Sequence, residues 1–139
     1  IVIGSANASG QVDYLNLALK GAQSAIYVGA LNTNGTTSAP ASLASYSNTP
    51  GADAVVQQQF VVVGVDGAKT GLYGTSFAAP IISGYAAILG SKFTKSTPTQ
   101  IANQLLKTAR QDTISGYNPA THGRGEASIT RALAPVSIQ

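Results

Sequence analysis

Apolar residues are grouped in three short runs that predict buried β-strands. Residues 1–6 read Ile-Val-Ile-Gly-Ser-Ala, residues 25–31 form a second run, and residues 60–65 hold four valines and one phenylalanine. Such nearly continuous runs are typical of parallel strands that are buried on both faces. The third run is the most strongly apolar and ends at the turn signal Asp66-Gly67, so we expect it at the centre of a sheet.

Between and after these runs, the spacing of apolar residues and the capping signals predict helices. Thr97, Pro98 and Gln100 combine an N-cap, a proline at the first helical position and the glutamine of a capping box. A small apolar segment starts at Ser76, and we expect Pro80 to fall in the first turn of that helix, where no hydrogen bond is lost. The predicted helices span residues 11–21, 76–89, 97–110 and 126–133.

The alternation of strands and helices predicts an α/β fold with three layers, in which a mostly parallel sheet is flanked by helices. Residues 32–50 are rich in Asn, Thr, Ser, Gly and Pro and are expected to form a surface loop, with a short strand near residues 43–47. The 139 residues fit a single domain, which we assign to residues 1–139.

The amino-acid composition excludes several classes of protein. Hydrophobic residues make up 44% and charged residues 9% of the chain, which excludes disorder driven by charge. No apolar run is long enough to span a membrane. The net charge of +3 comes from scattered residues, so a nucleic-acid partner is not expected, and the absence of cysteine excludes disulfides and thiolate metal sites. The chain has no methionine and opens inside a predicted strand, so we expect that a preceding segment is missing.

Residues 74–80, Gly-Thr-Ser-Phe-Ala-Ala-Pro, are the segment with chemical potential. A serine at a helix N-terminus has free backbone N–H groups and the positive end of the helix dipole beside it, which favours a developing oxyanion. Ser76 is therefore a candidate nucleophile. The alternative is that Ser76 is only an N-cap residue, which is the commoner role for serine at such a position.

The same segment resembles the catalytic-serine signature of the subtilisin-like serine proteases, the subtilases. The resemblance continues through the chain in the family's order. It includes a strand that ends at an asparagine (residues 1–7), a Val-Gly-Ala strand (26–31) and a Ser-Asn segment (44–48). It ends with Gly-Arg-Gly at residues 123–125 and Ala132, which resemble the closing Gly-x-Gly helix of the family. The chain thus resembles the C-terminal portion of a subtilase catalytic domain.

This resemblance implies roles for individual residues. Ser76 would be the nucleophile, and the side-chain amide of Asn7 would donate to the oxyanion together with the N–H of Ser76. Gly4, Ser5 and Ala6 would bind the substrate side chain that precedes the scissile bond. In the family, the catalytic Asp and His precede the region that this chain resembles, so the resemblance implies that the N-terminal part of the same domain must supply them. It also implies that a structural calcium ion could be bound, but it places no site, and no other cofactor is expected.

The chain departs from the family pattern at three places. Ala6 stands where the family usually has Gly before the oxyanion asparagine, and Ile81 stands where it usually has His after the signature proline. Residues 63–66, Val-Gly-Val-Asp, replace the expected Ala-Pro-Gly segment. None of these changes removes a catalytic group, although the last one predicts a different loop before Ser76.

Other catalytic constellations have weaker support. Ser76, Asp112 and His122 follow the Ser-Asp-His order of α/β-hydrolases, but the chain lacks the G-x-S-x-G elbow of that fold. We interpret His122 as a surface histidine in a loop. The opening Ile-Val-Ile-Gly resembles the N-terminus of trypsin-like proteases only by accident, because no Gly-Asp-Ser-Gly-Gly-Pro segment follows, and no His/Asp cluster has metal-ligand spacing.

These observations predict a fragment of a serine endopeptidase that cleaves polypeptides through an acyl-enzyme on Ser76 and is inactive without the N-terminal part of its domain. The alternative function is a non-catalytic fragment that acts as an interaction or self-association module through an exposed strand edge. The low charge, the absence of cysteine and the family resemblance favour a secreted or extracellular location, including the bacterial cell surface.

Overall fold

The computed structural model describes residues 2–4, 19–71 and 73–138. Three parallel strands form one sheet in the order β1 (Val2–Gly4), β2 (Ile26–Leu31) and β3 (Phe60–Gly64). Ile26 of β2 pairs with Val2, and Val28 pairs with Val61 of β3. Every residue of β2 and β3 is buried. The apolar runs therefore mark strands buried on both faces, and the predicted α/β class is confirmed.

The prediction that the third run lies at the centre of the sheet is wrong for the described residues, because β2 is the middle strand. The outer edge of β3 is instead covered by an irregular segment from the C-terminal part of the chain. The N–H of Val62 donates to the carbonyl of Gly125, and the N–H of Ala127 donates to the carbonyl of Val62, both at 2.9 Å. This segment hides β3 from solvent without forming a regular strand, which explains the strong apolar character of β3.

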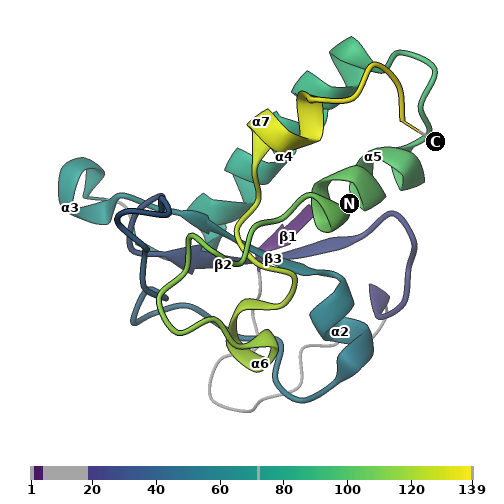
Figure 1. Ribbon diagram of the computed structural model, residues 1–139. Helices are drawn as coiled ribbons and strands as arrows, with labels where there is room; N and C mark the ends of the chain where they lie inside the picture. Colours follow the sequence, from purple (N-terminus) through teal and green to yellow (C-terminus); the bar gives the residue numbers. More distant parts are fainter. Residues whose placement is uncertain (1, 5–18, 72, 139) are drawn as a thin grey trace.

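Helices cover both faces of the sheet, as Figure 1 shows. On one face lie α4 (Thr75–Lys92), α5 (Pro98–Lys107) and α7 (Ile129–Leu133), and on the other lie α2 (Ala54–Gln58) and α6 (Pro119–His122). The four-residue helix α3 (Gly67–Thr70) extends to one side, where the turn signal Asp66-Gly67 begins a helical turn. The described residues contain no helix that is long and apolar enough to cross a membrane.

Each face of the sheet has its own hydrophobic core. Side chains alternate along a strand, so Val28 of β2 and Val61 of β3 pack with Ala78 and Ile82 of α4. On the opposite face, the larger core side chains are those of Tyr27, Leu31, Phe60, Val62, Ile114 and the partly buried Tyr117. The two cores therefore lie on opposite faces of the sheet.

The helix predicted from the capping signals over residues 97–110 forms as α5, Pro98–Lys107. The Thr97 hydroxyl accepts from the N–H of Gln100 at 3.2 Å, and the Gln100 side chain accepts from the N–H of Thr97 at 2.8 Å. The last predicted helix begins three residues later than expected, at Ile129, because the side chain of Ser128 caps it by accepting from the N–H of Arg131. Residues 126 and 127 are extended beside β3 instead.

Two other predictions concern the segments around β2. Most of the helix expected over residues 11–21 lies outside the described residues, although Gly21 has the positive φ of 79° that its predicted role as a cap requires. Residues 43–47 are described by the structure, and they do not form the short strand that was expected there. Leu43 makes only an isolated antiparallel bridge with Leu31.

The side chain of Gln59 forms hydrogen bonds with the turn before β2. Its side chain is buried, its Oε1 accepts from the N–H of Gly21 at 2.6 Å, and its Nε2 donates to the carbonyl of Ala22 at 2.9 Å. Longer bonds join the same Nε2 to the carbonyls of Leu19 and Ala25, at 3.3 and 3.4 Å. One amide group therefore joins several backbone groups of the turn before β2 to the end of α2.

Candidate active site

Ser76 lies in the first turn of α4, with its side chain exposed. The N-cap of this helix is Gly74, whose φ of 122° falls in the region that glycine adopts more readily than other residues. The helix begins at Thr75, one residue before the predicted start. Ser76 is therefore not the N-cap residue, and the capping alternative for this serine is wrong.

Pro80 is the sixth residue of α4, beyond the first turn in which it was expected. In a regular helix, the N–H at this position would donate to the carbonyl of Ser76, four residues before it. Proline has no N–H, so this carbonyl lacks its helical donor. The signature proline therefore loosens the backbone hydrogen bonding at the candidate nucleophile.

The local electrostatics favour negative charge at the Ser76 hydroxyl. The first hydrogen bond of the helix runs from the N–H of Phe77 to the carbonyl of Gly74, at 3.1 Å. The N–H of Ser76 precedes this bond and has no partner within the helix. Because α4 is 18 residues long, its aligned peptide dipoles add a partial positive charge at this end. An oxyanion that forms at Ser76 would meet both stabilising effects.

Aromatic side chains flank Ser76 in the sequence and are open to solvent. Tyr73 is 60% exposed and Phe77 is 39% exposed. The ring of Tyr73 meets the ring of Tyr46 edge to face, with centroids 5.9 Å apart. The hydroxyl thus lies in a segment that offers apolar contact surface together with a polar, reactive group.

The structure describes one of the four other predicted site residues. Gly4 is the last residue of β1 and pairs with Val28, and α4 packs against this strand. Ser5, Ala6 and Asn7 lie outside the described residues. The proposed substrate and oxyanion roles of these four residues therefore remain predictions.

His122 is buried, so its interpretation as a surface residue is wrong. Only 4% of the residue is exposed, and its ring stacks on Tyr117 with centroids 5.8 Å apart. Its Nδ1 accepts from the N–H of Asn118 at 3.1 Å, which fixes the orientation of the ring. Burial lowers the pKa of His122 below its ordinary value. The sequence concealed this because Thr121 and Gly123 are typical of loops, whereas His122 ends the short helix α6, which packs against β3 and α2.

The fold does not assemble Ser76, Asp112 and His122 into a triad. His122 packs with Tyr117 on the core opposite to the one that α4 covers. The carboxylate of Asp112 accepts two hydrogen bonds from the guanidinium of Arg110, at 2.9 and 2.7 Å. Asp112 and His122 therefore interact with residues other than Ser76.

Glu126 is a buried polar residue that the sequence reasoning missed. It was expected in a helix, but only 6% of it is exposed, and it lines a cavity between the C-terminal segment and the loop after β2. The sequence gives no signal of this burial, because Glu126 lies between polar and charged residues such as Arg124 and Ser128. Within the described part of the chain, no group of three or more His, Cys, Asp or Glu side chains could hold a metal ion.

Comparisons with known proteins show the family of the chain. The profile of the subtilase family, peptidase family S8, matches residues 5–128 of the chain. Mycosin-5 of Mycobacterium tuberculosis (strain ATCC 25618 / H37Rv) is 36% identical over 105 residues, which cover 69% of this chain. The matched region is 18% of the length of mycosin-5, so the chain spans a small part of that relative.

Proposed function

Because the chain belongs to the subtilase family, a family of serine peptidases, we propose that it carries the nucleophile of a serine endopeptidase, Ser76. The observation that carries the proposal is the exposed position of Ser76 in the first turn of α4, within the segment Gly74-Thr-Ser-Phe-Ala-Ala-Pro80. The substrate is a polypeptide, and the reaction passes through an acyl-enzyme.

In this proposal, the oxygen of Ser76 attacks the scissile carbonyl carbon while a histidine base removes the hydroxyl proton. The resulting oxyanion accepts hydrogen bonds from the N–H of Ser76 and from the side-chain amide of Asn7. The carbon–nitrogen bond then breaks, and the leaving amine takes the proton from the histidine. Water hydrolyses the ester on Ser76 with the same histidine as base, which restores the free serine.

Neither the base nor its aspartate partner comes from this chain in our proposal. The only histidine of the sequence is His122, which is buried on the face of the sheet opposite to α4. A second part of the same peptidase domain would supply the Asp and the His, packed beside β1, the outer strand of the described sheet. Gly4, Ser5 and Ala6 would then bind the substrate residue that precedes the cleaved bond.

The alternative function is a non-catalytic interaction or self-association module. It is favoured by the position of β1, which pairs with β2 on one side and with no other strand of the described residues. An exposed strand edge can pair with another chain. This alternative predicts a stable assembly that buries β1 and does not depend on Ser76.

The test compares hydrolysis of a fluorescently labelled protein substrate by the whole protein, including the part that supplies the Asp and the His, and by two serine variants of it. Ser76→Ala removes the nucleophile and is expected to lower turnover about 10⁴-fold or more, the scale typical of lost triad members. Ser83→Ala, at an exposed position of the same helix, is the matched control and should keep activity. Equal activity of the two variants would refute the proposal and favour the module.

The same family membership supports a proposal for location. We place the peptidase outside the cytoplasm, in the secreted fraction or at the surface of a bacterial cell, because the chain has few charges and no cysteine and because mycosin-5 is a bacterial relative. Fractionation of the producing cells, with detection of the protein in each fraction, tests this placement.

A further inference from the structure

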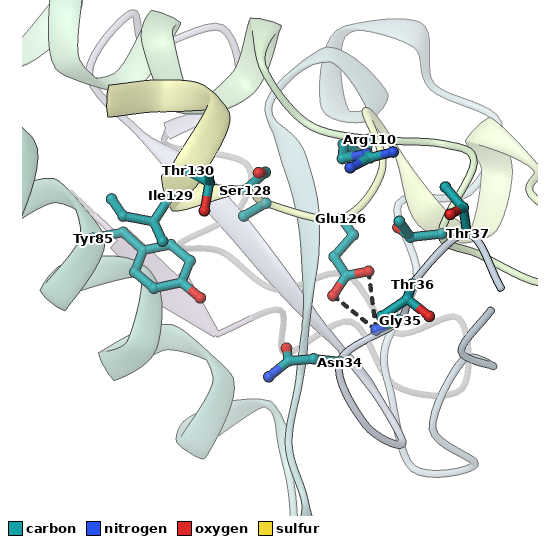
Figure 2. A pocket seen from close by; sticks show the side chains of 12 residues that line it. Asn34, Gly35, Thr36, Thr37, Tyr85, Arg110, Glu126, Ser128, Ile129 and Thr130 are labelled. Atoms are coloured by element: carbon teal, nitrogen blue, oxygen red, sulfur yellow. Dashed lines mark hydrogen bonds between the residues drawn. The ribbon is translucent and has the colours of Figure 1, made fainter. Parts of the chain in front are cut away.

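A cavity of about 300 Å³ lies apart from Ser76, between α4, the loop after β2 and the segment that leads into α7. Figure 2 shows Tyr85 on one side of this cavity and Glu126 and the loop residues Asn34 and Gly35 on the other. Tyr85 follows Ser76 by nine residues in α4, which places it roughly 13 Å further along the helix axis. The cavity is therefore separate from the candidate nucleophile.

The most unusual group in this cavity is the carboxylate of Glu126. Both of its oxygens accept from the N–H of Gly35, at 3.2 and 3.1 Å (Figure 2). A carboxylate has about four acceptor positions, so most of its hydrogen-bonding capacity is unused here. Burial raises the pKa of Glu126, which indicates that its negative charge is incompletely compensated.

Arg110 compensates the charge of this carboxylate only in part: its charge lowers the pKa of Glu126, but burial raises that pKa more. Arg110 also lines the cavity, but its guanidinium donates two hydrogen bonds to Asp112 and thereby forms a pair without net charge. Glu126 makes no ion pair with any described residue. A buried carboxylate beside an open cavity is stabilised by a ligand that brings a positive charge and hydrogen-bond donors.

The remaining wall of the cavity fits a ligand that is partly apolar and partly polar. The ring of Tyr85 and the side chain of Ile129 offer apolar surface, and the Tyr85 hydroxyl points into the space between them and Glu126 (Figure 2). The Thr113 hydroxyl is buried at the cavity wall and lies close enough to Glu126 to lower its pKa. Hydroxyl oxygens can accept hydrogen bonds from an ammonium group.

The position of Gly35 decides between the two common organic cations. Its N–H is almost equally distant from both oxygens of Glu126, so it occupies the edge between them. A guanidinium needs that edge for a pair of parallel hydrogen bonds, whereas an ammonium can approach one oxygen from its outer side. A residue larger than glycine cannot replace Gly35, because its Cβ would lie 2.0 Å from the carbonyl oxygen of Thr113.

We propose that this cavity binds a primary alkylammonium group, with its charge on Glu126 and its alkyl chain against Tyr85 and Ile129. The group could belong to a free amine or to a lysine side chain of a polypeptide. Divalent metal ions fit the cavity less well, because Glu126 is the only carboxylate among its described lining residues and calcium requires six to eight oxygen ligands.

The test measures binding to the full protein by saturation-transfer NMR, in a Ser76→Ala background that prevents cleavage of peptides. The probes are n-butylammonium chloride, n-propylguanidinium chloride and neutral n-butanol. We expect saturable binding of n-butylammonium, weaker binding of n-propylguanidinium and none of n-butanol. Glu126→Gln keeps an oxygen for the N–H of Gly35 and should weaken n-butylammonium binding about tenfold or more. Asp66→Asn, which alters an exposed carboxylate paired with Lys69, is the matched control and should bind like the parent protein.

The outcomes separate the source of the ligand from the failure of the proposal. An acetyl-Gly-Lys-Gly-amide peptide that binds in a Glu126-dependent way, more tightly than n-butylammonium, identifies a polypeptide lysine, whereas tighter binding of the free amine identifies a small amine. Absence of saturable n-butylammonium binding, equal binding by the Glu126→Gln variant, or equal binding of n-propylguanidinium would overturn the proposal. Circular dichroism of each variant confirms that a lost signal does not reflect unfolding.

Discussion

Two glycines illustrate how strongly the surroundings of a single residue differ within this fold. Gly64 ends β3, and a Cβ built there would lie 2.2 Å from the backbone nitrogen of Asn34. Gly84 lies in the middle of α4, and a Cβ there would meet nothing within 4 Å. The first glycine is required for close contact between the end of β3 and the loop after β2, whereas the second only weakens a helix.

Alanine substitution should therefore have opposite effects at these two positions. Gly84→Ala is expected to raise the free energy of unfolding by about 0.5–1 kcal/mol, the difference in helix propensity. Gly64→Ala is expected to lower it by about 1–3 kcal/mol, because a backbone clash must be relieved. Urea denaturation of both variants measures the change, and a stabilising effect of Gly64→Ala would contradict the packing described here.

At the scale of single elements, α5 is defined by signals that lie next to one another in the sequence. Thr97 and Gln100 cap each other, and Pro98 occupies the first helical position. The four-residue helix α6 differs, because it is too short to be stable alone. Its position depends on packing against β3 and α2.

Removing the cap of α5 should destabilise the protein measurably. Thr97→Ala leaves the N–H of Gln100 without its side-chain acceptor and is expected to cost about 0.5–2 kcal/mol of unfolding free energy. Thr94→Ala, at an exposed position before the helix, is the control and should change stability by less than about 0.5 kcal/mol. Equal losses in the two variants, measured by chemical denaturation, would show that the capping box contributes nothing.

The elements also show which features the sequence could predict. The strands β2 and β3 and the helices α4 and α5 were predicted because their apolar runs and capping residues are local. The order of the strands was not, because the segment that covers β3 contacts it through backbone hydrogen bonds at residues 125 and 127, which leave no apolar pattern. The burial of His122 and Glu126 was also missed, because no apolar pattern in the neighbouring sequence marks either residue as buried. Ser76 was found because its segment carries a family signature.

At the scale of the whole molecule, the sheet separates two environments. One face carries α4 with Ser76 near its start, and the other carries His122, packed on Tyr117. His122 is held in its neutral form by burial, which lowers its pKa from 6.5. Below that value the unfolded chain binds a proton that the folded chain resists, so folding becomes less favourable as the pH falls.

This arrangement predicts a pH dependence of stability that His122 controls. The unfolding midpoint in urea should be constant above the ordinary histidine pKa of 6.5 and should decrease as the pH falls below it, until the lowered pKa of the folded state is reached. His122→Gln cannot take up this proton and should remove most of the decrease between about pH 6.5 and 5.5. An unchanged slope in that variant would show that other groups cause the effect.

The central claim is that Ser76 is the nucleophile and that its base lies outside this chain. The most direct measurement is the labelling of the whole protein, including the part that supplies the Asp and the His, with a fluorophosphonate probe, with the modified residue located by mass spectrometry. We predict labelling at Ser76, at an unchanged rate in the His122→Gln variant. No labelling of folded protein at Ser76, or labelling that a folded His122→Gln variant has lost, would contradict the account.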